Sequence, residues 1–204
     1  MTRAPHQLPR GRHGLPHEYV VLHQRRRILR AVGELMADVG YTDLSIEMIL
    51  RHSGVSRRTY YDHFADKEAG AMAYFDTVTG ALFAAIDSSL SGAAAESMSA
   101  LDRALNTILA LVAEHPIPAQ VWLLNFGRSC ERLAHRRDLA MAQLARRLTT
   151  AETPKRSPIA VEIAIGGVCE LLRHRIQRGV NGTDLAAHEL IAVLLGSASS
   201  ANAN

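Results

Sequence analysis

Apolar residues along this chain recur every three to four positions, and that spacing is typical of amphipathic helices. The first long stretch, 18–39, carries apolar residues at Ile28, Ala31, Val32, Leu35, Met36 and Val39. Gly40 follows it, at a position where helices commonly end in a left-handed cap. We find no segment with the two-residue alternation of a β-strand. The pattern therefore predicts an all-α fold of about nine helices.

Two short helices are predicted after the first one. Ser45 and Ser56 each stand where a side-chain oxygen can cap a helix, and Ser53-Gly54 lies between them as a break. One short helix is therefore expected to follow Ser45 and another to cover 57–64. Asp66 then caps a longer fourth helix, which we expect to run to about residue 87.

The rest of the chain is predicted to form further helices, separated by loop signals. Residues 88–99 are rich in Ser, Gly and Ala and are expected to form a loop. Pro116 and Pro118 are expected to end the helix that precedes these two prolines. The helices expected there cover 101–112, 121–148 with a kink near Arg136, 159–177 and 183–195.

Composition excludes several classes of protein. Apolar residues make up 48% of the chain and charged residues 21%, as in ordinary soluble domains. No apolar run approaches the roughly 18 residues of a membrane span, and no apolar stretch follows the basic N-terminus. Two cysteines, Cys130 and Cys169, are too few for a disulfide framework. We expect a cytoplasmic protein with neither a membrane anchor nor a secretory signal.

Positive charge is concentrated in the first third of the chain. The first 67 residues carry 11 Lys and Arg against 7 Asp and Glu, and the remaining residues carry 12 against 13. Of the 23 basic residues 21 are arginine, which suits bidentate contacts to phosphate and guanine. This asymmetry indicates a polyanionic partner, although a solvated basic face would have the same composition.

The segment around Gly54 has the spacing of a helix-turn-helix unit. Gly54 permits the positive φ that the turn needs, while Ile49, Val55 and Tyr60 can pack the two helices together. The second helix is short and begins with arginines, as major-groove entry requires. Its exposed face offers side chains that reach bases and phosphates: Arg57, Arg58, Tyr61 and His63.

This unit resembles the DNA-binding domain of the tetracycline-repressor (TetR) family of bacterial transcription regulators. The resemblance spans roughly residues 22–68. It is carried by Gly40-Tyr41, Leu44-Ser45-Ile46, Ile49, Ser53-Gly54-Val55-Ser56, Thr59, Tyr61, His63-Phe64 and Lys67-Glu68. Three positions depart from the family pattern: Leu50 replaces alanine, Arg58 a small residue and Gly70 a leucine.

The resemblance implies a set of DNA contacts on the second and third helices and the start of the fourth. Tyr60 stands at the usual apolar position and is expected to be more core than contact, although its hydroxyl could reach a phosphate. The implied contacts are Ser45, Ser56, Arg57, Arg58, Thr59, Tyr60, Tyr61, His63 and Lys67.

The N-terminal segment offers a second contact with DNA. Residues 1–17 read as a disordered arm with Arg3, Arg10 and Arg12, and Arg25, Arg26 and Arg27 follow on the first helix. Arginines on such an arm can enter an A·T-rich minor groove, or they can simply add phosphate contacts.

The resemblance further implies a DNA-binding domain over 18–67, a ligand-binding and dimerisation domain over 68–196, and a disordered tail over 197–204. An apolar stripe on the last two helices supports a homodimer, which a palindromic operator would match. The stripe consists of Val161, Ile165, Val168, Leu172, Ile176, Leu190, Ile191 and Leu194. A pocket for a small apolar or aromatic effector is expected at Phe83, Leu105, Leu109, Trp122 and Phe126, although such residues often only form a core.

The alternatives have weaker signals. The chain has no phosphate-binding loop and no nucleophile or zinc-protease motif, so we expect no enzyme and no cofactor. Ten histidines and two cysteines lack metal-site spacing, and a metal- or redox-responsive regulator is a lesser alternative. A non-specific architectural DNA-binding protein would need only the basic third. The sequence thus predicts a ligand-responsive repressor that binds a double-stranded DNA operator as a homodimer.

Overall fold

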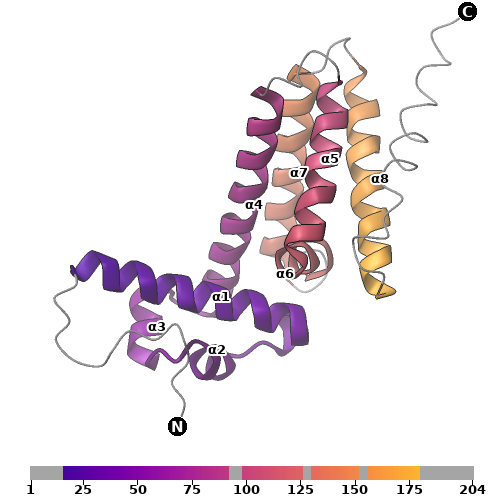
Figure 1. Ribbon diagram of the computed structural model, residues 1–204. Coiled ribbons are helices and arrows are strands. Elements are labelled where there is room, and N and C mark those ends of the chain that lie inside the picture. The colour runs from indigo at the N-terminus through magenta and orange to yellow at the C-terminus, as the bar shows by residue number, and fades with distance from the viewer. Residues whose placement is uncertain (1–15, 92–97, 126–129, 152–155, 180–204) are drawn as a thin grey trace, which may run out of the picture. The chain divides into compact units, whose positions relative to one another are not determined.

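A computed structural model of the chain describes residues 16–91, 98–125, 130–151 and 156–179. In those ranges the chain forms eight α-helices and one short π-helix, without β-strands (Figure 1). The all-α prediction is confirmed. The predicted helix over 183–195, the tail over 197–204 and all but the last two residues of the arm lie outside the described residues.

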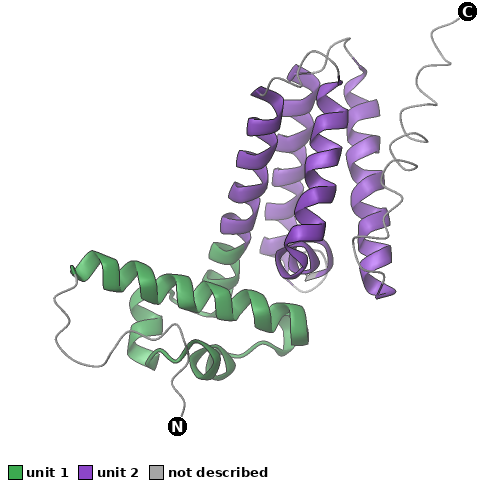
Figure 2. Ribbon diagram, in the orientation of Figure 1, with its two compact units in different colours: residues 1–74 green, residues 75–204 purple. Residues whose placement is uncertain are grey.

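The chain divides into two compact units, residues 1–74 and residues 75–204 (Figure 2). Helix α4, Lys67–Ser91, belongs to both, because the division falls after Tyr74. Its first turns pack within unit 1 and its remainder packs within unit 2. One continuous helix therefore joins the two units.

Unit 1 contains the three helices predicted from the N-terminal third. These are α1, His17–Asp43; α2, Ile46–Ser53; and α3, Arg57–His63. Gly40 breaks the regular path of α1 with φ 78° and ψ 171°. The helix break predicted at Gly40 is confirmed and its φ is positive, but its ψ is extended rather than left-handed helical.

The core of unit 1 is built from the apolar faces of its helices. Ile28, Val32, Ile49 and Tyr60 are at most 1% exposed. The ring of Tyr74 on α4 lies against Gly33 of α1, so closely that a Cβ on Gly33 would stand 2.3 Å from Tyr74 Cζ. Only glycine fits at that point, and the start of α4 is thereby held against α1.

Unit 2 is a helical bundle whose helices lie side by side in Figure 1. Besides the rest of α4, the unit comprises α5, Ala100–Glu114; α6, Pro116–Gln120; the π-helix η2, Val121–Asn125; α7, Glu131–Ala151; and α8, Pro158–Gln177. Its core includes Phe75, Ile86, Leu101, Leu105, Leu133, Leu144, Leu148, Val161, Ile165 and Leu172.

Two expectations for unit 2 need correction. The helix predicted over 121–148 begins instead as the π-helix η2, and α7 passes through Arg136 without the predicted kink. The physical reason is that no proline or glycine stands near Arg136, and kinks require such a residue or an inserted group. The loop predicted over 88–99 also starts later, because α4 continues to Ser91.

By length and composition alone, α4 could cross a membrane, with a mean hydropathy of 1.3 over 18 residues. Long core helices of soluble proteins have the same property. Several of its apolar side chains, such as Phe75 and Ile86, are buried in the bundle. Packing in the bundle therefore accounts for part of the apolar character of α4, since a third of this window is buried.

Candidate nucleic-acid interface

Side-chain caps fix where the two helices of the helix-turn-helix begin. Ser45 Oγ accepts a hydrogen bond from the Met48 N–H at 3.2 Å, and Ser56 Oγ accepts one from the Thr59 N–H at 3.0 Å. Gly54 adopts φ 65° and ψ 25°, and its N–H donates to the Leu50 carbonyl at 2.9 Å. Both predicted caps and the predicted glycine turn are confirmed.

Arginines of α1 are engaged inside unit 1. The Arg27 guanidinium donates to the Ser53 carbonyl at the end of α2, and burial lowers the pKa of Arg27. The Arg25 guanidinium lies 4.8 Å from the centroid of the Phe64 ring. Arg27 thus joins α1 to the end of α2, whereas Arg26 is exposed. Contact of these arginines with DNA stays a prediction.

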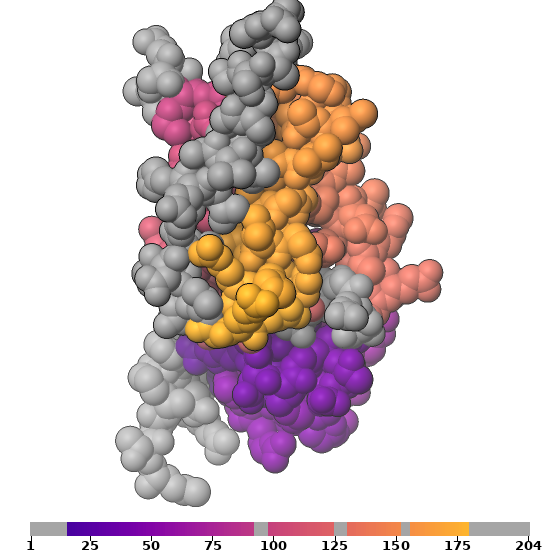
Figure 3. Space-filling model, turned by 90° about the vertical axis from the view of Figure 1, so that its right-hand side faces the viewer, coloured from indigo at the N-terminus to yellow at the C-terminus, as the bar shows by residue number. Residues whose placement is uncertain are grey.

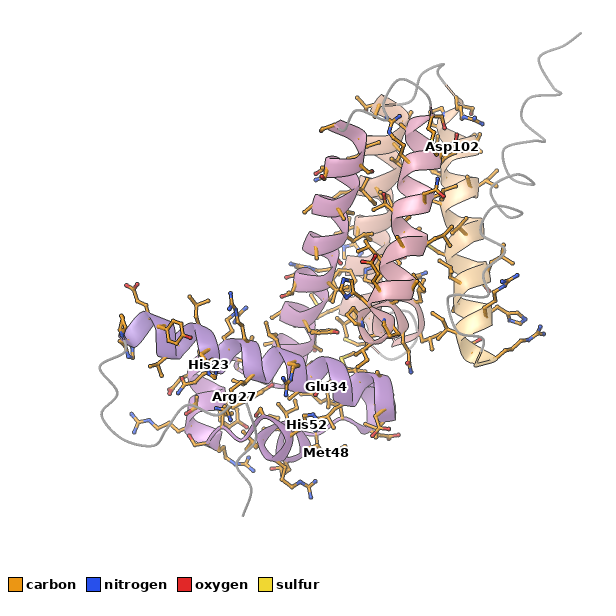
Figure 4. All side chains as sticks on the ribbon, viewed as in Figure 1. His23, Arg27, Glu34, Met48, His52 and Asp102 are labelled. Atoms are coloured by element: carbon orange, nitrogen blue, oxygen red, sulfur yellow. The ribbon has the colours of Figure 1, made fainter. Side chains whose placement is uncertain are left out.

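A second polar contact joins α1 and α2. His52 Nε2 lies 2.6 Å from Glu34 Oε2 across the two helices (Figure 4). Together with Arg27, this contact fixes the orientation of α2 against α1. The sequence pattern contains no periodic signal for either contact, because their partners stand 18 and 26 residues apart.

The first turn of α3 presents its arginines to solvent. Arg57 and Arg58 are exposed, as is Tyr61, and Thr59 lies half-buried between them. Arg57 forms an ion pair with Glu47 on the first turn of α2. The hydrogen bond from Arg57 lowers the pKa of the Glu47 carboxyl, and the same bond raises the pKa of Arg57. An acidic residue thus stands beside the predicted base-contacting arginine, and no sequence pattern had indicated it.

Tyr60 does not belong to the exposed face, and its assignment as a DNA contact is corrected. Its side chain is fully buried, and its hydroxyl donates to the Asp66 carbonyl at 3.0 Å. A Cβ on Gly70 would stand 2.7 Å from this hydroxyl. The glycine that departs from the family pattern therefore provides the space that the tyrosine hydroxyl occupies.

His63 and Lys67 lie at the edge of the exposed face and are half-buried. Burial, followed by the nearby charge of Arg25, lowers the pKa of His63. Lys67 Nζ donates to the Tyr41 and Thr42 carbonyls at 3.1 and 3.4 Å and lies over the Tyr41 ring. Lys67 thus caps the end of α1, which occupies two of the three donors of its ammonium group.

The residues predicted to line an effector pocket lie in unit 2. Leu105, Leu109 and Trp122 are buried, and the Trp122 N–H donates to Thr79 Oγ1 at 3.2 Å. Phe83 is half-buried, with the Arg147 guanidinium 4.6 Å from its ring centroid. Phe126 lies outside the described residues.

The predicted dimer stripe needs correction. Val161, Ile165, Val168 and Leu172 are at most 2% exposed, since this face of α8 packs into the core of its own unit. Side chains so buried cannot also contact a second subunit. Ile176 is half-buried, and Leu190, Ile191 and Leu194 lie outside the described residues. The exposed apolar side chains of α8 are instead Ile159, Ile163 and Leu171, at 67%, 64% and 39% exposure.

The titratable sulfur groups differ in burial. Cys169 is buried, and burial raises the pKa of its thiol to about 11, whereas Cys130 is half-buried. Within the described ranges, no three histidine, cysteine or acidic side chains lie close enough together to hold a metal ion.

The sequence of the helix-turn-helix matches a known family. Residues 28–69 match the model of the tetR family of bacterial regulatory proteins. The resemblance predicted from the sequence is confirmed by this match. None of the curated proteins matches the chain in sequence.

Solved structures share the fold of the whole chain. The fatty acid degradation regulator FadR from Bacillus halodurans is 20% identical with a TM-score of 0.72, over 84% of this chain and 97% of that one. A TetR-like transcriptional regulator from Rhodococcus sp. RHA1 is 17% identical with a TM-score of 0.72, over 91% and 98%. FadR from Bacillus subtilis, in complex with stearoyl-CoA, is 18% identical with a TM-score of 0.71, over 83% and 96%. The chain therefore has the fold of these regulators.

Proposed function

Residues 28–69 match the tetR family of bacterial regulatory proteins, and on that premise we propose that the chain is a member of this family and a homodimeric transcriptional repressor of the cytoplasm. In this proposal it binds a palindromic DNA operator and releases the operator when a small apolar or aromatic effector binds to unit 2. The observation that carries the proposal is the first turn of α3, where Arg57 and Arg58 stand exposed on a helix fixed by its cap and by the Gly54 turn.

The proposed DNA contacts divide by chemistry. Arg57 and Arg58 read base edges in the major groove, because a guanidinium can pair with guanine through two hydrogen bonds. Thr59, Tyr61 and His63 bind neighbouring phosphates, which fixes the orientation of α3 but carries no sequence information. The helix N-termini at Ser45 and Ser56 and the remaining donor of Lys67 add further phosphate contacts.

The operator geometry requires two copies of the chain. Two recognition helices related by a two-fold axis enter successive major grooves when they stand about 34–36 Å apart. We assign the dimer contact to the face of α8 that carries the exposed Ile159, Ile163 and Leu171, where a Cβ on Gly167 would meet no atom within 4 Å beyond its own helix backbone and its chain neighbours. The surface of α8 is coloured orange to yellow in Figure 3. Small residues beside large apolar ones allow two helices to approach closely.

The effector is proposed to act through α4. Exposed ion pairs link α4 to α7 within unit 2, Arg136 with Asp76 at 2.7 Å and Arg147 with Asp87 at 2.5 Å. Because α4 continues into unit 1, a shift of these helices around an effector changes the spacing of the two recognition helices. The stearoyl-CoA bound by FadR from Bacillus subtilis supports an apolar ligand in a domain of this fold.

The test is binding of the purified protein to labelled DNA from beside its own gene, over a salt series and against random competitor DNA. We expect binding that survives the competitor, at two protomers or a multiple per site. Replacing Arg57 and Arg58 by alanine should abolish this specific binding while circular dichroism stays unchanged, because both side chains are exposed. A double variant that still protects the same operator would show that α3 is not the recognition helix.

The same titration separates the repressor from an architectural DNA-binding protein. Random competitor DNA would displace an architectural protein from the labelled DNA. Its binding would also depend steeply on salt concentration, since only phosphate contacts would hold it. The proposed dimer contact is tested by sedimentation of Ile163→Asp, which should be monomeric. Leu139→Asp, at a similarly exposed position of α7, should remain a dimer.

A further inference from the structure

One charged side chain stands in the apolar face of α7. The buried positions of this helix include Leu133, Ala140, Leu144 and Leu148, and Arg137 lies four residues after the first and three before the second. Residues at these spacings share one face of a helix. Arg137 is half-buried, and its Nε is shielded from solvent without a hydrogen-bond partner. A shielded donor of this kind is costly unless something pairs with it.

Two arginines of α7 have carboxylate partners, whereas the described part of the chain offers Arg137 none. Arg136 binds both oxygens of Asp76 at 2.8 and 2.7 Å, and Arg147 binds Asp87. Among the residues that the structure describes, no carboxylate forms an ion pair with Arg137. Within the described part of unit 2, the charge of Arg137 therefore has no ion-pair partner.

Two groups of α8 feel the charge of Arg137, and neither neutralises it. The Cys169 thiol is buried, and the pKa of about 11 that burial gives it keeps the thiol neutral at pH 7. The Glu170 carboxylate is bound by Arg173, whose Nε donates to Glu170 Oε2 at 2.8 Å. The place of a counter-ion beside Arg137 is thus not taken by its neighbours on α8.

An aromatic ring lies near this guanidinium. Arg137 Cζ is 5.7 Å from the centroid of the Trp122 ring, and Trp122 is fixed by its hydrogen bond to Thr79. Trp122 belongs to η2, and π-helical turns occur frequently at functional sites. Three elements, η2, α7 and α8, therefore bring a cation, an apolar ring and a neutral thiol together.

We propose that Arg137 and Trp122 recognise an organic anion, so that the effector is an acid whose carboxylate or sulfonate pairs with Arg137 while its apolar body packs on Trp122. The planar guanidinium fork binds such an anion through two parallel hydrogen bonds, and the shielded surroundings strengthen them. This inference rests on the proposed function, because it names the chemical class of the effector of unit 2.

Two fluorescent probes with the same ring system test the charge requirement. Anilinonaphthalene sulfonate is an anion, and N-phenyl-1-naphthylamine is its neutral counterpart. Trp122 is the only tryptophan in the chain, so energy transfer from tryptophan to a probe reports binding near this site. We expect the sulfonate to bind about tenfold more tightly than the neutral amine, which corresponds to one charge-assisted contact.

Variants on α7 assign that preference to Arg137. Arg137→Met should weaken sulfonate binding about tenfold and leave binding of the neutral amine unchanged, while Arg137→Lys should retain part of the preference. Arg146→Met removes the same charge from an exposed position of α7 and should change neither probe. Thermal unfolding of each variant shows whether it is folded.

The inference is overturned if the wild-type protein does not prefer the sulfonate, or if Arg137→Met and Arg146→Met lose affinity equally. The first result would mean that unit 2 does not select anions, and the second that only net charge matters. The titrations contain no DNA, and operator binding by the wild-type protein is measured without probes. Failure of the repressor proposal and failure of the anion site are therefore distinguishable.

Discussion

The two units differ in how the functional residues relate to the helices that carry them. In unit 1 the groups that set the helix ends, Ser45, Gly54 and Ser56, act over three to four residues. In unit 2 the proposed functional groups are Trp122, Arg137 and the exposed face of α8. Their surroundings are formed by residues that are far away in the sequence. Caps and turns can therefore be predicted from a few neighbouring residues. Which face of a bundle helix is buried depends on residues that are distant in the sequence.

The dimer stripe illustrates this difference. The apolar residues of α8 fall on two faces, and sequence periodicity identifies both without saying which one the bundle covers. The face with Val161 and Ile165 is buried in unit 2, and the face with Ile159 and Ile163 is exposed. Only the packing partners decide between them.

The largest expected effect is at the contact between Gly33 and Tyr74 in unit 1. Gly33→Ala would place a Cβ 2.3 Å from a ring atom, and we expect the free energy of unfolding to fall by about 1–3 kcal/mol through overpacking. Urea unfolding followed by circular dichroism and by Trp122 fluorescence measures it. In Gly33→Ala, the circular dichroism signal should begin to fall at a lower urea concentration than the fluorescence of Trp122, which reports on unit 2 alone.

The matched control for Gly33→Ala is a helical glycine of unit 2. Gly80 is exposed on α4, and a Cβ added there would meet no atom within 4 Å beyond its own helix backbone and its chain neighbours. Gly80→Ala should therefore stabilise the protein by about 1 kcal/mol through helix propensity. Equal effects of the two substitutions would contradict the assigned contact between α1 and α4.

Much of unit 1 could be predicted from the sequence because helix caps and turns depend on neighbouring residues. The features of unit 1 that the prediction missed all depend on contacts between distant residues. The break at Gly40 and the caps at Ser45 and Ser56 were predicted correctly. The contact of Arg27 with Ser53 spans 26 residues, and no periodic pattern encodes it. The pairing of the Tyr60 hydroxyl with Gly70 is likewise a matter of space, which only the packed helices define.

Alkaline pH should act on unit 1 before unit 2. Burial raises the pKa of Tyr60 and of Tyr74 from 10 to about 12. Because the folded pKa lies above the unfolded one, this contribution to stability is complete below pH 10 and is lost as the pH rises to 12. All five tyrosines lie in unit 1, so tyrosinate absorbance reports on that unit. The rise in tyrosinate absorbance at the highest pH should coincide with loss of helix, while Trp122 fluorescence still has its native value.

Substitution separates this effect from general alkaline unfolding. Tyr60→Phe removes one of the two late-titrating phenols and should weaken the pH dependence between 10 and 12. Tyr19→Phe, at an exposed position of α1, should leave it unchanged. A pH dependence that is the same in both variants would refute the link to Tyr60.

Helix caps are expected to have smaller and more uniform effects. Ser45→Ala and Ser56→Ala should each lower the free energy of unfolding by about 1 kcal/mol, since each removes a hydrogen bond to a backbone N–H. Ser157 precedes α8 without such a bond, and Ser157→Ala should therefore change stability far less. Chemical denaturation compares the three, and a loss at Ser157 as large as at Ser45 would contradict the assignment of the caps.

The smallest effect concerns Glu47, the acidic residue beside the proposed base-reading arginine. Its carboxylate is paired with Arg57, and both side chains are exposed, so the pair contributes little to stability. In the proposed complex with DNA, however, we expect the carboxylate to repel phosphates and to hold Arg57 away from them. Glu47→Gln should therefore strengthen binding to random DNA about threefold at low salt, an effect that salt screens.

The specificity ratio decides whether Glu47 acts locally. If its carboxylate restrains Arg57, then Glu47→Gln gains affinity for random DNA without an equal gain for the operator, and the ratio of the two affinities falls. Glu131→Gln makes the same change in net charge at an exposed position of α7 and should leave the ratio unchanged. Equal gains in affinity for random DNA in both variants would mean that Glu47 acts only through the net charge of the protein. A gain confined to Glu47→Gln would mean that an acidic side chain in unit 1 helps to exclude the wrong DNA.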